Sequence, residues 1–142
     1  MTRNIDKLAG GKESAEILGW STQQVTEYNK RGKFPKPIQQ LACGKIWLVS
    51  QIEQYKNART YGFLDFEGRE YLMQDQAEFT GRQLSDWQTE EGYTEFSAPA
   101  VDWDGNEYRV FWVLRTLHDN GEEVEDLSDL NWDKINRVEP VY

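Results

Sequence analysis

The chain has 142 residues, a formal net charge of −9 and an aromatic content of 13%, with six tryptophans. No run of about eighteen apolar residues could span a bilayer, and residues 1–12 lack the apolar stretch of a secretory signal. The single cysteine, Cys43, excludes an internal disulfide and cannot by itself form a metal site. We therefore expect a soluble, cytoplasmic protein without a membrane segment, a metal or a cofactor.

Charge divides the chain near residue 60. Residues 1–60 hold ten Lys and Arg against five Asp and Glu, about +5, whereas residues 61–142 hold six against twenty, about −14. Phosphate is attracted by the local field of a binding face, so the acidic total does not exclude nucleic-acid binding. Hydrophobic periodicity changes at the same place. The sequence therefore predicts two domains, 1–60 and 61–142, in an α+β chain.

The N-terminal half begins with a pattern for two short helices joined by a turn. Residues 12–18 can bury one face of a first helix, which Gly19 ends. Ser21 can cap the second helix, in which Val25 and Tyr28 turn inward. The polar positions left pointing outward are Thr22, Gln23, Thr26, Glu27 and Lys30. Such side chains meet base edges when a helix enters the major groove, and an ordinary solvated face is the alternative.

A basic connection and a hairpin pattern follow the second helix. Residues 32–37 contain two prolines, which exclude a helix. Residues 38–48 are typical of two short strands around a Cys-Gly step. Ser50 is expected to cap a last helix, with Ile52 and Tyr55 facing inward.

Four segments carry a family resemblance. They are residues 15–21 (AEILGWS), 31–38 (RGKFPKPI), 44–47 (GKIW) and 50–55 (SQIEQY). Over about residues 10–59, this arrangement resembles the AlpA-like and excisionase-like winged helix-turn-helix regulators of the broader MerR-type superfamily. The resemblance implies that the second helix enters the major groove of double-stranded DNA while the hairpin, or wing, touches the backbone. It implies base contacts from Thr22, Gln23, Thr26 and Lys30, and phosphate contacts from Lys36 and Lys45.

The candidate DNA-binding residues combine these outward positions with the basic side chains around them. They are Ser21, Thr22, Gln23, Gln24, Thr26, Lys30, Arg31, Lys33, Lys36 and Lys45. The chain departs from the family pattern at Thr22, where an arginine is frequent, and at Trp20, where a valine is common. We expect Trp20 to pack in the core or between domains, with DNA contact as the alternative. Because so small a domain contacts a short half-site, we expect a homodimer.

The C-terminal half has the pattern of a small antiparallel sheet. Residues 69–73, 93–101 and 106–117 are predicted strands, with Asp104-Gly105 as a hairpin signal between the last two. Tyr108, Val110, Trp112 and Leu114 share one face of the last strand. Phe111 and Val113 lie on the other, so this strand is expected to be buried on both sides or central to the sheet. Residues 137–141 could supply a closing strand, which Pro140 restricts to an edge. Residues 84–88 fit either a helical turn or a loop.

No pattern in the chain predicts an enzyme. Asp102, Asp104, Asn106 and Glu107 approach the spacing of a calcium loop, but a turn explains them without a metal. His118, the only histidine, has no Ser or Cys partner in a recognisable motif and is expected in a loop. The chain has no Gly-rich phosphate loop and no paired metal motif.

The most acidic run is residues 122–129. A solvated loop is one interpretation. The other is a surface that binds a basic protein partner or imitates the phosphate row of nucleic acid. Its candidate residues are Glu122, Glu123, Glu125, Asp126 and Asp129. This half somewhat resembles small uncharacterised bacterial proteins with a DGNEY hairpin and an acidic segment that ends in NWD.

Together these patterns predict a sequence-specific DNA-binding transcriptional regulator, or an excisionase-like factor, of bacterial, phage or mobile-element origin. The alternative is a protein-interaction module, such as a phage inhibitor of a host nucleic-acid-handling or defence protein. In that case the acidic half would bind the target, and the N-terminal half would regulate expression of the protein itself.

Overall fold

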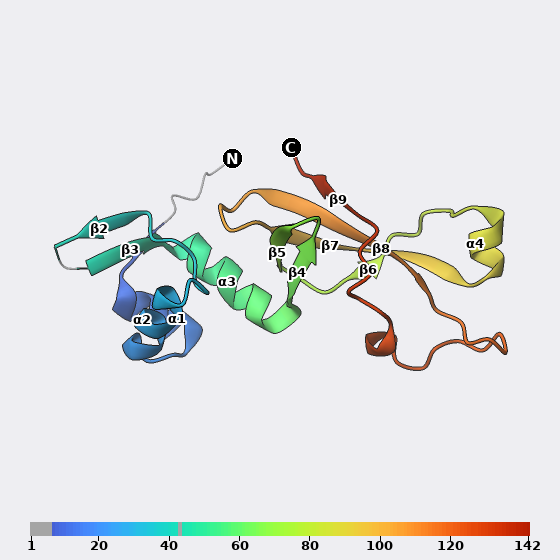
Figure 1. Ribbon diagram of the computed structural model, residues 1–142, viewed down its shortest axis with the longest axis horizontal. Coiled ribbons are helices and arrows are strands. Elements are labelled where there is room, and N and C mark those ends of the chain that lie inside the picture. Colours follow the sequence, from blue (N-terminus) through green and yellow to red (C-terminus); the bar gives the residue numbers. More distant parts are fainter. Residues whose placement is uncertain (1–6, 43) are drawn as a thin grey trace.

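A computed structural model describes residues 7–42 and 44–142 of the chain and has an α+β fold, as expected. Figure 1 shows the helices α1 to α3 and the hairpin β2–β3 towards one end of an elongated molecule, with a long twisted sheet extending to α4 at the other end. The elements are β1 (Leu8–Ala9), α1 (Gly11–Leu18), α2 (Thr22–Lys30), β2 (Gln39–Leu41), β3 (Gly44–Leu48), α3 (Val49–Tyr61), β4 (Phe63–Phe66), β5 (Arg69–Met73), β6 (Glu78–Phe79), α4 (Asp86–Glu90), β7 (Tyr93–Val101), β8 (Glu107–Arg115), the 3-10 turn η1 (Leu127–Asp129) and β9 (Arg137–Pro140).

The turn between α1 and α2 has the predicted chemistry. Gly19 ends α1 with a φ of 71°, a left-handed conformation that glycine adopts without strain. The Trp20 N–H closes the turn by donating to the Ala15 carbonyl over 2.9 Å. Ala15 and Val25 are both buried, so each helix turns its small or branched side chain toward the other. The prediction for these two helices is confirmed.

Side-chain hydrogen bonds hold the basic connection between α2 and the hairpin. The Trp47 indole donates to the Pro35 carbonyl and the Tyr55 hydroxyl donates to the Lys33 carbonyl, each over 2.8 Å. The two predicted strands are β2 and β3, which form a small antiparallel sheet with β1. Cys43, predicted at the hairpin tip, lies outside the described residues.

Helix α3 begins earlier than the sequence predicts. Its first residue is Val49, so Ser50 lies inside the first turn, and the prediction that Ser50 caps this helix is wrong. The Gln51 amide oxygen makes the capping contact, since it accepts from the Leu48 N–H over 2.8 Å. Ile52 and Tyr55 are buried, as expected. Across residues 7–42 and 44–142, no helix combines the length and apolar character needed to cross a membrane.

The larger sheet is antiparallel throughout, in the order β4-β5-β7-β8-β9, with β6 beside β7. Strands β5 and β7 have the predicted bounds, and β9 lies at an edge, as Pro140 requires. Strand β8 is shorter than predicted. Residues 84–88 were expected to form either a helical turn or a loop, and the structure has the short helix α4 there. The sequence pattern does not predict β1, β4 or β6.

Two clusters of buried residues stabilise the molecule. The first joins α1, α2, β3 and α3 and includes Leu72 and Val101 from the large sheet. The second lies on the opposite sheet face, around Phe96 and Trp112, and the segment from Leu130 to Val138 packs against it. Because α3 packs on β5 and contributes Ile52 to the first cluster, the basic half and the acidic half share buried surface.

Candidate nucleic-acid interface

The exposed face of α2 carries the predicted base-reading side chains. Val25 is 2% exposed and turns into the core. At about 100° per residue, Gln23 and Lys30 fall on the opposite side of the helix and Thr26 falls on its flank. All ten candidate DNA-binding residues are exposed. The helix therefore presents amide, hydroxyl and ammonium groups, which can make hydrogen bonds with base edges.

Two of the candidates also hold the start of this helix. Ser21 and Gln24 form a capping box: the Gln24 N–H donates to the Ser21 hydroxyl oxygen over 3.2 Å, and the Ser21 N–H donates to the Gln24 amide oxygen over 3.0 Å. The hydroxyl hydrogen of Ser21 and the amide nitrogen of Gln24 remain as donors. These two side chains order the helix end that carries Thr22 and Gln23.

The hairpin and α2 enclose a groove, which we call the α2–hairpin groove. Thr26 and Asn29 line it from the helix, and Gln40 and Lys45 line it from the hairpin. Its volume is about 690 Å³, and Lys12 of α1 also lines it. Thr26 and Lys45 are nineteen positions apart in the chain, so the fold brings them to one surface.

Lys36 lies on the connection to the hairpin. Its carbonyl accepts from the Gln51 amide over 2.9 Å, which ties the backbone at this point to α3. The Lys36 side chain is exposed. A cation on a fixed backbone can contact phosphate without a further loss of backbone entropy.

Arg31 and Lys33 lie apart from the groove. Arg31 pairs with Glu27 at 3.7 Å, and its guanidinium lies 5.8 Å from the ring centroid of Tyr28. Arg31 and Lys33 line a different cavity, toward the large sheet. The predicted DNA-binding residues are therefore not all on one surface. Thr26 and Lys45 line the α2–hairpin groove, whereas Arg31 and Lys33 line another cavity.

Arg59 and Lys12 line these cavities but were not among the predicted site residues. Lys12 lines the groove beside Glu13. Arg59 lies over aromatic rings, with its guanidinium 4.9 Å from the ring centroid of Trp20. Trp20 packs against the first cluster, as predicted. The sequence places Arg59 one helical turn after Tyr55, which predicts that the two side chains are neighbours. It does not show which other aromatic rings surround the guanidinium.

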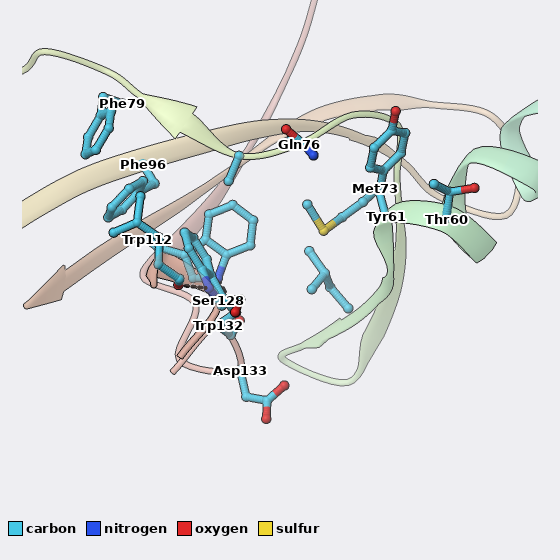
Figure 2. Close-up of a pocket in the computed structure, with 13 residues that line it drawn as sticks. Thr60, Tyr61, Met73, Gln76, Phe79, Phe96, Trp112, Ser128, Trp132 and Asp133 are labelled. Carbon is cyan, nitrogen blue, oxygen red and sulfur yellow. Dashed lines mark hydrogen bonds between the residues drawn. The ribbon is translucent and has the colours of Figure 1, made fainter. Parts of the chain in front are cut away.

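The acidic run lies in the segment between β8 and β9, and a third cavity lies beside it. Glu122, Glu123, Glu125, Asp126 and Asp129 are all exposed. Hydrogen bonds donated by the Ser128 hydroxyl and N–H lower the pKa of Asp126, which caps η1. Beside η1 lies a cavity of about 540 Å³. Figure 2 shows Phe79, Phe96, Trp112 and Trp132 along one wall, Met73 across from them and Asp133 at the rim.

The loop from Asp102 to Asn106 is a turn held by its first carboxylate. Asp102 accepts from the N–H groups of Asp104 and Asn106, each over 2.9 Å, and from the Tyr108 hydroxyl over 3.1 Å. Burial alone would raise the pKa of Asp102, but these hydrogen bonds outweigh it and leave the pKa lowered. Within the part of the chain that the structure describes, no three His, Cys, Asp or Glu side chains gather where they could hold a metal ion.

Comparison of the chain with protein-family models, with curated proteins and with solved structures finds no match.

Proposed function

We propose that this protein is a sequence-specific DNA-binding regulator, in which α1, α2 and the hairpin act as a winged helix-turn-helix. Helix α2 would enter the major groove, with Gln23, Thr26 and Lys30 at base edges. The hairpin would follow the backbone with Lys45. A homodimer would read two half-sites, since one unit of this size covers too little DNA for high specific affinity.

The observation that carries this proposal is the α2–hairpin groove. Thr26 of the helix and Lys45 of the hairpin line the same surface, and the apolar side of α2 is buried against α1. A reader of duplex DNA needs a polar helix face beside backbone-contacting cations. The charge of residues 1–60, about +5 from ten basic and five acidic side chains, supports the same function.

The test is a gel-shift titration of the full chain with labelled fragments from the DNA around its own gene, over a range of salt. One fragment should bind more tightly than the rest, with an affinity that falls as salt rises. The double variant Gln23→Ala/Lys30→Ala should bind that fragment about tenfold more weakly, because the proposal assigns both side chains to base contacts. Its circular dichroism spectrum should be unchanged, since both residues are exposed.

The matched control is Gln83→Ala/Lys134→Ala. It removes the same two side-chain types from exposed positions in the acidic half. Equal binding to every fragment, no binding at low salt, or the same shift for both double variants would end the proposal.

A second candidate function is capture of a basic protein partner by the acidic half. Tyr61, Phe79 and Leu127 are exposed apolar residues that line the cavity beside η1, where Asp133 also lies. An apolar pocket with an acidic rim is suited to an apolar side chain flanked by cations. The titration above tests DNA binding alone, and the two functions are compatible because they use different halves of the chain.

A further inference from the structure

We propose that a cavity between the helices and the large sheet binds a planar organic anion, of the class of a nucleoside monophosphate. We call it the junction pocket. It has a volume of about 470 Å³. Its walls come from the end of α2, from α3, from β4 and β5, and from the loop between β7 and β8. The lining residues that carry the argument are Arg31, Lys33, Arg59, Tyr55, Phe63 and Trp103.

Charge in the junction pocket is positive, although the chain as a whole is acidic. Three cations line it, and Glu70 is the one carboxylate among its lining residues. The ion pairs of the described residues include neither Arg59 nor Lys33. The Arg31–Glu27 pair is exposed on both sides, so the pairing is weak and leaves Arg31 able to turn to another anion. An anion would therefore be attracted to this cavity.

Aromatic rings hold the Arg59 guanidinium in place. It lies 4.9 Å from the ring centroid of Trp20, 5.3 Å from that of Tyr28 and 5.9 Å from that of Tyr55. One of its N–H groups donates to the Tyr55 hydroxyl over 3.4 Å. A guanidinium has five donors, so most of the fork remains for a ligand. A planar, positioned fork matches the oxygens of a phosphate or a carboxylate.

The rings at the pocket rim favour a planar ligand over a simple anion. Phe63 is 42% exposed, and its ring centroid lies 6.1 Å from that of Trp103 with 25° between the planes. A flat ring laid on Phe63 would cover apolar surface that now faces water. Stacking of a base on an aromatic side chain contributes about 1–3 kcal/mol. The ligand class therefore joins a ring to an anionic group.

This site is separate from the α2–hairpin groove. No residue lines both cavities, and only Arg31 and Lys33 of the candidate DNA-binding residues line the junction pocket. Binding of a small ligand here does not require that the chain binds DNA.

The test is isothermal titration calorimetry of the full chain with three probes: adenosine monophosphate, adenosine and inorganic phosphate. Adenosine monophosphate should bind with a Kd of about 1 mM or tighter. Adenosine lacks the anion and phosphate lacks the ring, so each should bind at least about tenfold more weakly.

Variants locate the binding. Arg59→Gln should weaken the binding of adenosine monophosphate at least tenfold, to about 10 mM or more if the wild type binds at about 1 mM, because it removes the charged guanidinium. The matched control is Lys56→Gln, which removes one charge from an exposed position on the same helix and should leave the Kd unchanged. Phe63→Ala should weaken binding about fivefold. If Arg59→Gln lowers the melting temperature, the exposed Phe63 still provides a test.

Three results would overturn the proposal. The first is absence of saturable binding of adenosine monophosphate up to about 10 mM. The second is binding of inorganic phosphate as tight as that of adenosine monophosphate, and the third is an equal affinity of the Arg59→Gln, Phe63→Ala and Lys56→Gln variants for adenosine monophosphate. None of them depends on the gel-shift titration, so failure of this site and failure of DNA binding are distinguishable.

Discussion

Glu95 is a buried carboxylate, and both of its oxygens accept hydrogen bonds. Its exposure is 3%, and it lies on β7 on the sheet face opposite Phe96. It accepts from Arg82 over 2.9 Å, from Arg137 over 3.1 Å and from the Thr80 hydroxyl over 2.9 Å. Through these bonds Glu95 ties β9 and the segment after β6 to the central strand.

The pKa of Glu95 follows from two opposed effects. Burial would raise it, but hydrogen bonds from Thr80 and Arg137, together with the charges of Arg137 and Arg82, outweigh burial and leave the pKa lowered. A carboxylate with a lowered pKa in the folded state stabilises the protein above its unfolded pKa of about 4.3. That contribution is lost as the pH falls through the folded pKa.

We expect Glu95→Gln to lower the free energy of unfolding by about 2 kcal/mol at neutral pH, a value reduced because Arg82 is largely exposed. The difference from the wild type should shrink as the pH falls from about 4.3, where Glu95 of the unfolded chain takes up its proton, through the lowered pKa of the folded protein. Urea unfolding at several pH values measures this. A difference that stays constant down to low pH would contradict the assignment.

At the scale of the element, α2 depends on its first turn. It has nine residues, and a helix of this length is marginal unless packing and caps support it. Val25 is its one buried residue. The capping box of Ser21 and Gln24 therefore supplies a large part of what orders the face proposed to meet DNA.

Ser21→Ala should lower the free energy of unfolding by about 1 kcal/mol, because the Gln24 N–H loses its acceptor. The control is Thr22→Ala, one position further along, which keeps the cap. Thermal melts followed by circular dichroism compare the two variants. Equal melting temperatures would show that the capping box contributes nothing to stability.

The turn of the β4–β5 hairpin explains why β4 was not predicted from the sequence. Its two-residue turn places Glu67 at a φ of 52° and Gly68 at a φ of 80°. Positive φ at both central positions is characteristic of the type I′ turn, which commonly joins the two strands of a hairpin. Asn or Asp usually precedes the glycine there, and this chain has Glu, so the local signal was weak. Strand β4 forms because it pairs with β5 and buries Leu64.

At the scale of the molecule, the break in charge near residue 60 is not a break in the core. Leu72 and Val101 belong to the acidic half and are buried with Ile52 and Tyr55 of α3. The basic helices therefore pack on a surface that the large sheet supplies. Unfolding of either half would expose apolar surface of the other.

This packing predicts coupled unfolding. Leu72→Ala should lower the free energy of unfolding by about 3 kcal/mol, since it leaves a cavity in the first cluster. The helix signal in the far-ultraviolet and the tryptophan signal in the near-ultraviolet should move to the same lower urea midpoint. Arg69→Ala, an exposed change on the same strand, is the control. A midpoint that moves for only one signal would show that the halves unfold separately.

Local sequence signals determined much of this protein. Gly19 and Ser21 delimit the turn between α1 and α2, because a left-handed residue and a cap act within a few positions of the chain. The apolar pattern gave the bounds of β7 and the set of residues that share a strand face with Trp112, since side chains of a strand alternate between two faces.

The tertiary structure alone decided what depends on contacts between distant segments. Local pattern favoured Ser50 as a cap, but the path from β3 into α3 starts the helix at Val49. The separation of Arg31 and Lys33 from the α2–hairpin groove follows from packing, as does the aromatic setting of Arg59. These features depend on three-dimensional proximity, and spacing along one chain carries no information about which remote surfaces meet.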